Sequence, residues 1–109
     1  MVRAIYVVYA NWCPHCVPTT VEPLKALAKK LGVQFVPYDI DTGDEEKADA
    51  LVRKYGDWTE DYLIPQVFVE MEDGRIRHVL TGRPEGLRYT KAAVEELLKS
   101  EMFVRPTAK

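Results

Sequence analysis

The two cysteines of this chain, Cys13 and Cys16, lie three positions apart and soon after the apolar run 4–9. This spacing allows a disulfide between them. A strand that turns straight into a helix at such a pair places the first sulfur at the helix N-terminus, where backbone N–H groups and the helix dipole favour negative charge. We therefore expect Cys13 to be a thiolate near neutral pH and Cys16 to lie within its reach on the first helical turn. The predicted chemistry is thiol–disulfide exchange.

The dipeptide between the cysteines, Pro14 and His15, is expected to tune the pair. Whatever stabilises the Cys13 thiolate stabilises the reduced form, and so makes the disulfide a stronger oxidant. A cationic or N–H-donating His15 would do this, which favours an oxidising role. The alternative is a solvated histidine at the helix start that points away from the sulfur.

A zinc site is a competing interpretation of the cysteine pair. Such a site needs two further ligands, and the only imidazoles are His15 and His78. His15 cannot easily join both flanking cysteines on one metal without distorting the turn. His78 alternates with arginines in the strand pattern 75–80, which is typical of a structural or surface residue. We therefore predict no metal in a single chain, and keep a metal or cluster shared between two chains as an alternative.

The composition indicates one domain. The chain has 109 residues, of which 47% are hydrophobic, enough for one modest core but not for two. A formal net charge of −2, with acidic and basic residues mixed along the chain, argues against nucleic acid as a partner. No stretch suits a membrane span or a signal peptide, so we expect a cytoplasmic protein. One asparagine and two glutamines favour a thermophilic source.

Hydrophobic patterning predicts a β-α-β order for the first part of the chain. Residues 2–10 are nearly continuous in apolar side chains, which is typical of a central strand. A helix is expected over 14–31, kinked at Pro23. The next strand, 33–40, is expected at an edge of the sheet because Pro37 cannot donate to a neighbouring strand.

The second part is expected to hold a helix, a hairpin and a last helix. Thr42 and Glu45 fit a capping box for a helix that Gly56 ends. The runs 66–71 and 75–80 fit an antiparallel hairpin. In the last helix we expect Thr90 to be the N-cap, Tyr89 and Val94 to form a hydrophobic staple, and residues 102–109 to be a loosely held tail.

The order β-α-β-α-β-β-α, with Cys-x-x-Cys at the first strand-to-helix junction, resembles the thioredoxin-fold superfamily over residues 2–101. The similarity is to its short, four-stranded form of glutaredoxin size. It implies a single α/β domain over residues 1–109, with a thioredoxin-like mixed sheet and three helices. In that family a cis proline begins the third strand and faces the cysteines, and Ile64-Pro65 stands at the corresponding place. The resemblance implies that Cys13 is the exposed nucleophile and Cys16 the more buried resolving thiol.

The sequence also departs from individual branches of the superfamily. Its Cys-Pro-His-Cys quartet is similar to that of the bacterial disulfide-forming (Dsb) oxidases, not to Cys-Gly-Pro-Cys of thioredoxins or Cys-Pro-Tyr-Cys of glutaredoxins. Val7 stands where thioredoxins carry a buried aspartate that assists proton transfer. Glutaredoxins hold glutathione at positions that here read Ala10, Leu63-Ile64 and Gly82-Arg83. These departures weigh against a glutathione site, although Arg83 could still meet a carboxylate.

The resemblance leaves a groove for an extended protein segment beside the cysteines. Its expected lining is Trp12, Ile64, Pro65 and Gly82. Trp12 is expected to be partly exposed, with simple packing as the alternative. Trp58 and Tyr62 could rim the same groove, but core packing under a loop is the favoured interpretation of both.

We therefore predict an enzyme, a protein disulfide oxidoreductase that works as a monomer on protein disulfides or dithiols, without cofactor or metal. The pattern leaves open whether it mainly oxidises or reduces. One alternative is a glutaredoxin-like or thioredoxin-like reductase fed by glutathione or by a flavoenzyme. Another, from a different class, is a thioredoxin-fold module that binds a metal or cluster.

Overall fold

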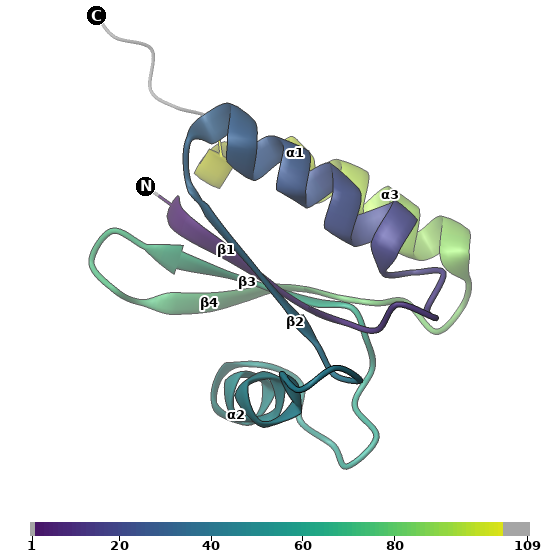
Figure 1. Cartoon of the computed structure of the whole chain (residues 1–109). Coiled ribbons are helices and arrows are strands. Elements are labelled where there is room, and N and C mark those ends of the chain that lie inside the picture. The colour runs from purple at the N-terminus through teal and green to yellow at the C-terminus, as the bar shows by residue number, and fades with distance from the viewer. Residues whose placement is uncertain (1, 104–109) are drawn as a thin grey trace, which may run out of the picture.

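Four strands form one mixed sheet in the computed structural model, which describes residues 2–103 (Figure 1). The strands are β1 (Val2–Tyr9), β2 (Gln34–Asp39), β3 (Gln66–Met71) and β4 (Ile76–Thr81). The helices are the π-helical turn η1 (Val17–Val21), α1 (Glu22–Leu31), α2 (Glu45–Tyr55), α3 (Leu87–Leu98) and the 3₁₀ turn η2 (Glu101–Phe103). This architecture is consistent with a thioredoxin-like fold, as expected.

The strand order is β2-β1-β3-β4. β1 runs parallel to β2 and antiparallel to β3, and β3 pairs with β4 in an antiparallel hairpin. The predicted central place of β1 and edge place of β2 are both confirmed. Pro37 lies opposite Val7 on this edge strand, where its missing N–H breaks no ladder on the outer side.

Helices cover both faces of the sheet, with α1 and α3 side by side on one face and α2 on the other (Figure 1). Side chains of β1 alternate between the two layers, because Ile5 and Val7 belong to the larger core with α1 and α3, whereas Val8 packs with α2. All three are fully buried. Each such side chain contributes about 1.5–3 kcal/mol to folding, so β1 is a firmly held element from which the next segment departs.

The first helix begins three residues later than predicted, at Val17. Pro18 lies at its start, and because proline lacks an N–H it could not have continued a helix from residue 14. Pro23 lies in the first turn of α1, directly after the π-helical turn. The helix type therefore changes next to Pro23, from the π-helical turn to α1. The end at Gly32 is as expected, with φ 70° in the left-handed region.

The predicted capping box of the second helix is wrong. α2 begins at Glu45, its N-cap is Asp44, and no side chain caps it. Thr42 instead donates its backbone N–H to the carbonyl of Asp39 in the turn after β2. The apolar face of α2 is as predicted, since Ala48, Leu51 and Val52 are buried, and the helix ends before Gly56.

The predicted N-cap and staple of the last helix are also wrong. α3 begins at Leu87 after Gly86, whose φ of 156° lies in a region that favours glycine. Thr90 is therefore inside the helix and fully buried, and Tyr89 is exposed. The hydroxyl of Thr90 bonds to the ring of His15 and to the backbone N–H of Arg83, both outside the helix.

The packed part of the chain extends at least to Phe103, which is buried in the larger core. The predicted tail therefore does not begin at residue 102, and residues 104–109 of that prediction lie outside the described part. Within residues 2–103 no helix has the length and apolar character needed to cross a membrane.

Candidate functional site

The two cysteines lie in a tight turn that follows β1. The backbone N–H of Cys13 bonds to the carbonyl of Ala10 at 3.1 Å, and that of Cys16 to the carbonyl of Cys13 at 3.0 Å. Both are free thiols and form a small buried cluster with Ala10, against which Ile40 and Ile64 pack. Cys16 is fully buried and Cys13 keeps 7% of its surface. Cys13 is thus less exposed than predicted, yet it is the more accessible of the two.

Threonine hydroxyls hold this turn where the helix backbone cannot. Pro18 has no N–H to give to the carbonyl of Pro14, and the hydroxyl of Thr19 donates to that carbonyl at 3.2 Å. The hydroxyl of Thr20, which is buried, donates to the carbonyl of His15 at 2.7 Å. The prediction that Cys16 lies on the first helical turn is wrong, because Cys16 precedes η1 as its N-cap.

The environment of the two sulfurs is asymmetric. Burial raises the pKa of the Cys16 thiol above its ordinary value, and the hydrogen bond with the Cys13 thiol adds to this, while a backbone hydrogen bond from Ala10 opposes it. The negative charge of Asp39 acts in the same direction as burial. Cys16 is therefore the thiol that the fold keeps protonated.

Asp39 is a buried carboxylate near the cysteine turn that the sequence did not single out. It ends β2, opposite Tyr9, and is 4% exposed. One oxygen accepts a hydrogen bond from the side-chain amide of Asn11 at 2.7 Å, and the other accepts the backbone N–H of Asp41 at 2.9 Å. Asp39 thereby ties the segment before Cys13 to the end of β2. Only its place at a strand end, beside the β1 terminus, could have indicated it.

His15 is half-buried, and its ring is anchored across the molecule. Its Nδ1 lies 2.7 Å from the hydroxyl oxygen of Thr90 on α3. The same oxygen accepts the backbone N–H of Arg83 at 2.8 Å. His15 is thus not a freely solvated side chain. Thr90 is a second residue that the sequence did not place at the site, because 75 positions separate it from His15.

The peptide bond between Ile64 and Pro65 is cis, as the resemblance implied. Its surroundings leave no room for a side chain at residue 82, because a Cβ there would lie 2.5 Å from the carbonyl oxygen of Ile64. The backbone N–H of Gly82 donates to the carbonyl of Pro65 at 2.7 Å. Ile64 packs against the cysteine cluster, so three of the predicted groove residues meet beside the cysteines.

The side-chain amide of Gln66, which is fully buried, holds the loop over residues 57–63. Its amide oxygen accepts the N–H of Asp57 at 3.1 Å, and its amide nitrogen donates to the carbonyl of Leu63 at 3.0 Å. Trp58 is half-buried against the α2 side of the core, which agrees with the favoured core interpretation, and the guanidinium of Arg53 lies over its ring.

A cleft of about 330 Å³ opens beside the cysteine turn. Trp12, 69% exposed, lines it, and its indole N–H donates to the carboxylate of Asp41. Tyr62 lines the same cleft and donates its hydroxyl to Asp49. The apolar lining is Trp12, Ile40, Tyr62 and Ile64, and the charged lining is Asp41, Glu45, Asp49, Glu60 and Asp61. Every charged residue of the lining is acidic.

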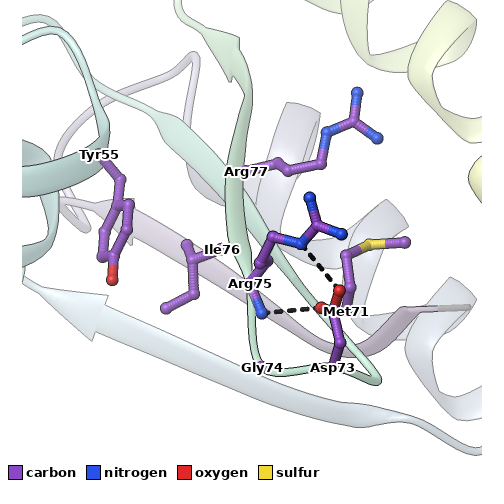
Figure 2. Close-up of a pocket in the computed structure, with 7 residues that line it drawn as sticks. All are labelled: Tyr55, Met71, Asp73, Gly74, Arg75, Ile76 and Arg77. Atoms are coloured by element: carbon purple, nitrogen blue, oxygen red, sulfur yellow. Dashed lines mark hydrogen bonds and ion pairs between the residues drawn. The ribbon is translucent and has the colours of Figure 1, made fainter.

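A larger cleft, of about 780 Å³, lies at the other end of the sheet (Figure 2). It runs from Tyr55 along the β3–β4 hairpin, where Arg75 bonds to Asp73 through both its backbone and its side chain. This hairpin adjoins the start of β1, since Val2 pairs with Met71, whereas the cysteines follow its end. The larger cleft is therefore remote from the thiols.

No cluster of three or more histidine, cysteine or acidic side chains suited to a metal ion occurs in the part of the chain that the structure describes. Comparisons of the chain with protein-family models, with curated proteins and with solved structures find no match. The small α/β fold and the Cys-x-x-Cys spacing are compatible with a thioredoxin-like protein. The functional interpretation therefore depends on the geometry of the cysteine turn and its surroundings.

Proposed function

We propose that this chain is a thiol–disulfide oxidoreductase of the thioredoxin-fold superfamily that exchanges disulfides with protein substrates through Cys13 and Cys16. The observation that carries the proposal is the asymmetry of the two thiols. They share one small cluster, in which Cys13 retains a solvent-accessible surface and Cys16 is sealed. An attacking thiol must be reached by the substrate, and a resolving thiol only needs to reach its neighbour.

In the reducing direction, the Cys13 thiolate attacks one sulfur of a substrate disulfide. The substrate S–S bond breaks, a mixed disulfide with Cys13 forms, and the second substrate sulfur leaves as a thiolate that takes a proton. Cys16 then gives up its proton and attacks the Cys13 sulfur, which releases the first substrate sulfur as a thiol. Two electrons pass from the cysteine pair to the substrate. Oxidation of a substrate dithiol is the same sequence in reverse.

The raised pKa of Cys16 supports this division of roles. Burial raises the pKa of Cys16 and keeps this thiol protonated until it resolves the mixed disulfide. The hydrogen bond between the two thiols also favours the protonated form of Cys16.

The substrate that the surroundings favour is an extended segment of protein chain. The exposed indole of Trp12 provides an apolar platform beside the cysteine turn, and Ile64 and the cis Pro65 form the opposite wall. Gly82 supports this wall, because its missing side chain lets the end of β4 lie directly against the carbonyl of Ile64. The carboxylates of the neighbouring cleft favour segments that carry lysine or arginine.

The test of the two-thiol mechanism uses single serine variants. Cys13→Ser is expected to abolish the exchange of a protein disulfide, because no accessible thiol remains. Cys16→Ser is expected to accumulate covalent adducts with substrate that a reductant releases. The double variant is the control for non-covalent binding. Normal turnover by Cys16→Ser, or no adducts with any protein disulfide, would contradict the proposal.

The direction of the reaction is set by the potential of the pair. Equilibration with glutathione buffers is expected to give a potential more oxidising than the roughly −270 mV of thioredoxin, because His15 can supply an N–H to the reduced pair. A value at or below that level overturns the proposed role of His15. Metal analysis together with a thiol count separates the competing binding module, which requires stoichiometric metal and two protected thiols.

A further inference from the structure

The hydroxyl of Thr90 lies between the two sides of the proposed redox site. Its oxygen is 2.7 Å from Nδ1 of His15, which belongs to the cysteine turn, and 2.8 Å from the backbone nitrogen of Arg83. Arg83 directly follows Gly82, the residue that contacts the cis peptide. Thr90 is fully buried on α3. One hydroxyl thus joins α3, the turn that carries the cysteines and the loop after β4.

The donors and acceptors around this hydroxyl determine which nitrogen of the His15 ring carries the hydrogen. A threonine hydroxyl has one hydrogen to donate and two lone pairs. The N–H of Arg83 occupies one lone pair. A buried hydroxyl donates its hydrogen to an acceptor, and of its two bonded neighbours only Nδ1 of His15 can accept. The neutral ring then carries its own hydrogen on Nε2.

We propose that Thr90 is a positioning residue of the redox site, which fixes the ring of His15 and its Nε2–H tautomer beside the cysteine pair. The functional consequence rests on the proposed disulfide exchange. An imidazole held with an N–H on its free nitrogen can donate to a thiolate, which stabilises the reduced pair and makes the disulfide more oxidising. A ring without this anchor divides its population among rotamers and tautomers.

The tautomer itself can be read in the wild-type protein by long-range ¹H–¹⁵N correlation of the imidazole nitrogens. We expect His15 in its neutral form to show Nδ1 as an acceptor and Nε2 as protonated. His78 is an internal reference, because its Nε2 lies 3.0 Å from the carbonyl oxygen of Leu80, which can only accept. The variant His78→Gln assigns the signals. A His15 protonated on Nδ1 in its neutral form would overturn the proposal.

Two substitutions separate the hydroxyl from the shape of the side chain. Thr90→Val keeps the shape and removes the hydroxyl, whereas Thr90→Ser keeps the hydroxyl. In Thr90→Val we expect the nitrogen signals of His15 to shift to those of an imidazole that exchanges between its two neutral tautomers. The signals of His78 should not change. We expect the equilibrium constant for oxidising glutathione to fall about tenfold, which corresponds to about 30 mV for this two-electron couple. Thr90→Ser should retain both wild-type properties.

The same pair of substitutions in a His15→Ala background tests whether Thr90 acts through the ring. There Thr90→Val should leave the equilibrium constant unchanged. An equal fall with and without the imidazole would mean that Thr90 acts through the fold, and the proposal would fail. If Thr90→Val does not fold, the ¹H–¹⁵N correlation of wild-type His15 still tests the proposal, because it reads the tautomer directly. An Nε2–H tautomer in a protein without disulfide exchange would refute the proposed function and leave the positioning of His15 intact.

Discussion

Gly82 donates its backbone N–H to the carbonyl of Pro65 at 2.7 Å, and a side chain at residue 82 would collide with the carbonyl of Ile64. This contact fixes the distance between the start of β3 and the end of β4. It also holds the wall of the proposed groove that faces the cysteines. The glycine is needed for space and not for its backbone angles, because its φ is not positive.

Gly82→Ala is therefore expected to distort the proposed site. The new Cβ would meet backbone atoms, which cannot move aside as a flexible side chain can, at a cost of about 2 kcal/mol in the free energy of unfolding. Disulfide exchange should fall more than tenfold. Urea unfolding and a turnover assay measure the two effects.

Gly74→Ala is the matched control for this substitution. Gly74 has a φ of 89°, so alanine there costs about 1–2 kcal/mol, but it lies in the hairpin at the other end of the sheet. We expect a similar loss of stability with unchanged turnover. Equal losses of turnover in both variants would show that Gly82 acts only through global stability.

The raised pKa of Cys16 predicts a loss of stability at alkaline pH in the reduced protein. An unfolded thiol ionises near pH 8.5, whereas the buried thiol of Cys16 keeps its proton well above that pH. The folded state then binds more protons than the unfolded state, so the free energy of unfolding falls as pH rises, by up to about 1.4 kcal/mol per pH unit.

Urea unfolding of the reduced protein between about pH 7 and 10 measures this slope. Cys16→Ser lacks the buried titrating thiol and should therefore show a shallower decline. Parallel curves would contradict the inferred burial of the Cys16 proton. At neutral pH, alkylation of the folded wild type should modify Cys13 well before Cys16.

The acidic lining of the cleft beside Trp12 predicts a preference for cationic substrates. At low ionic strength, kcat/KM should be about tenfold higher for a disulfide peptide flanked by lysines than for one flanked by glutamates. The difference should largely vanish in about 0.5 M salt, where charges are screened within a few ångströms.

Neutralising two exposed carboxylates of the cleft, with Glu60→Gln and Asp61→Asn, should remove much of this preference. Glu95→Gln with Glu101→Gln removes the same charge from other exposed positions, on α3 and η2, and should not. If both double variants lower the preference alike, net charge and not the cleft is responsible.

The buried amide of Gln66 predicts that the loop over residues 57–63 depends on a single side chain. In Gln66→Leu the N–H of Asp57 and the carbonyl of Leu63 lose their partner, which should lower the free energy of unfolding by about 2 kcal/mol. Chymotrypsin should then cut the native protein at Trp58 or Tyr62.

Gln34→Leu is the control for this substitution, because Gln34 is exposed on β2 and should change stability by less than about 0.5 kcal/mol. A native loop that resists chymotrypsin equally in both variants would show that Trp58 and its neighbours hold the loop without Gln66.

Local sequence signals predicted the elements whose cause is local. The continuous apolar run of β1, the edge proline of β2 and the glycine after α1 each act within a few residues, and all three predictions are confirmed. The Cys-x-x-Cys turn could be found from its residue types, and the cis Ile64-Pro65 peptide was implied by the family resemblance. The predicted helix start at residue 14 is wrong, because Pro18 has no N–H for the helical hydrogen bond.

The rest of the site could not be read from the sequence, because its partners are distant along the chain. Thr90 fits a local capping pattern, but its hydroxyl accepts the backbone N–H of Arg83 in the loop after β4. The hydroxyl of Thr90 bonds to His15, and the amide of Gln66 to a loop that has no pattern of its own. Single polar residues inside a helix or a strand give no local sign of such long-range bonds.

Side-chain hydroxyls, and not the helix backbone, hold the cysteine turn. The carbonyls of Pro14 and His15 are bound by rotatable side chains of Thr19 and Thr20 and not by the backbone N–H ladder of the helix. If Cys13 and Cys16 form the proposed disulfide, the change in the turn falls on these side-chain hydrogen bonds and not on the backbone hydrogen bonds of η1 and α1. The proposed redox cycle would therefore act on the turn and leave the helix that follows it wound.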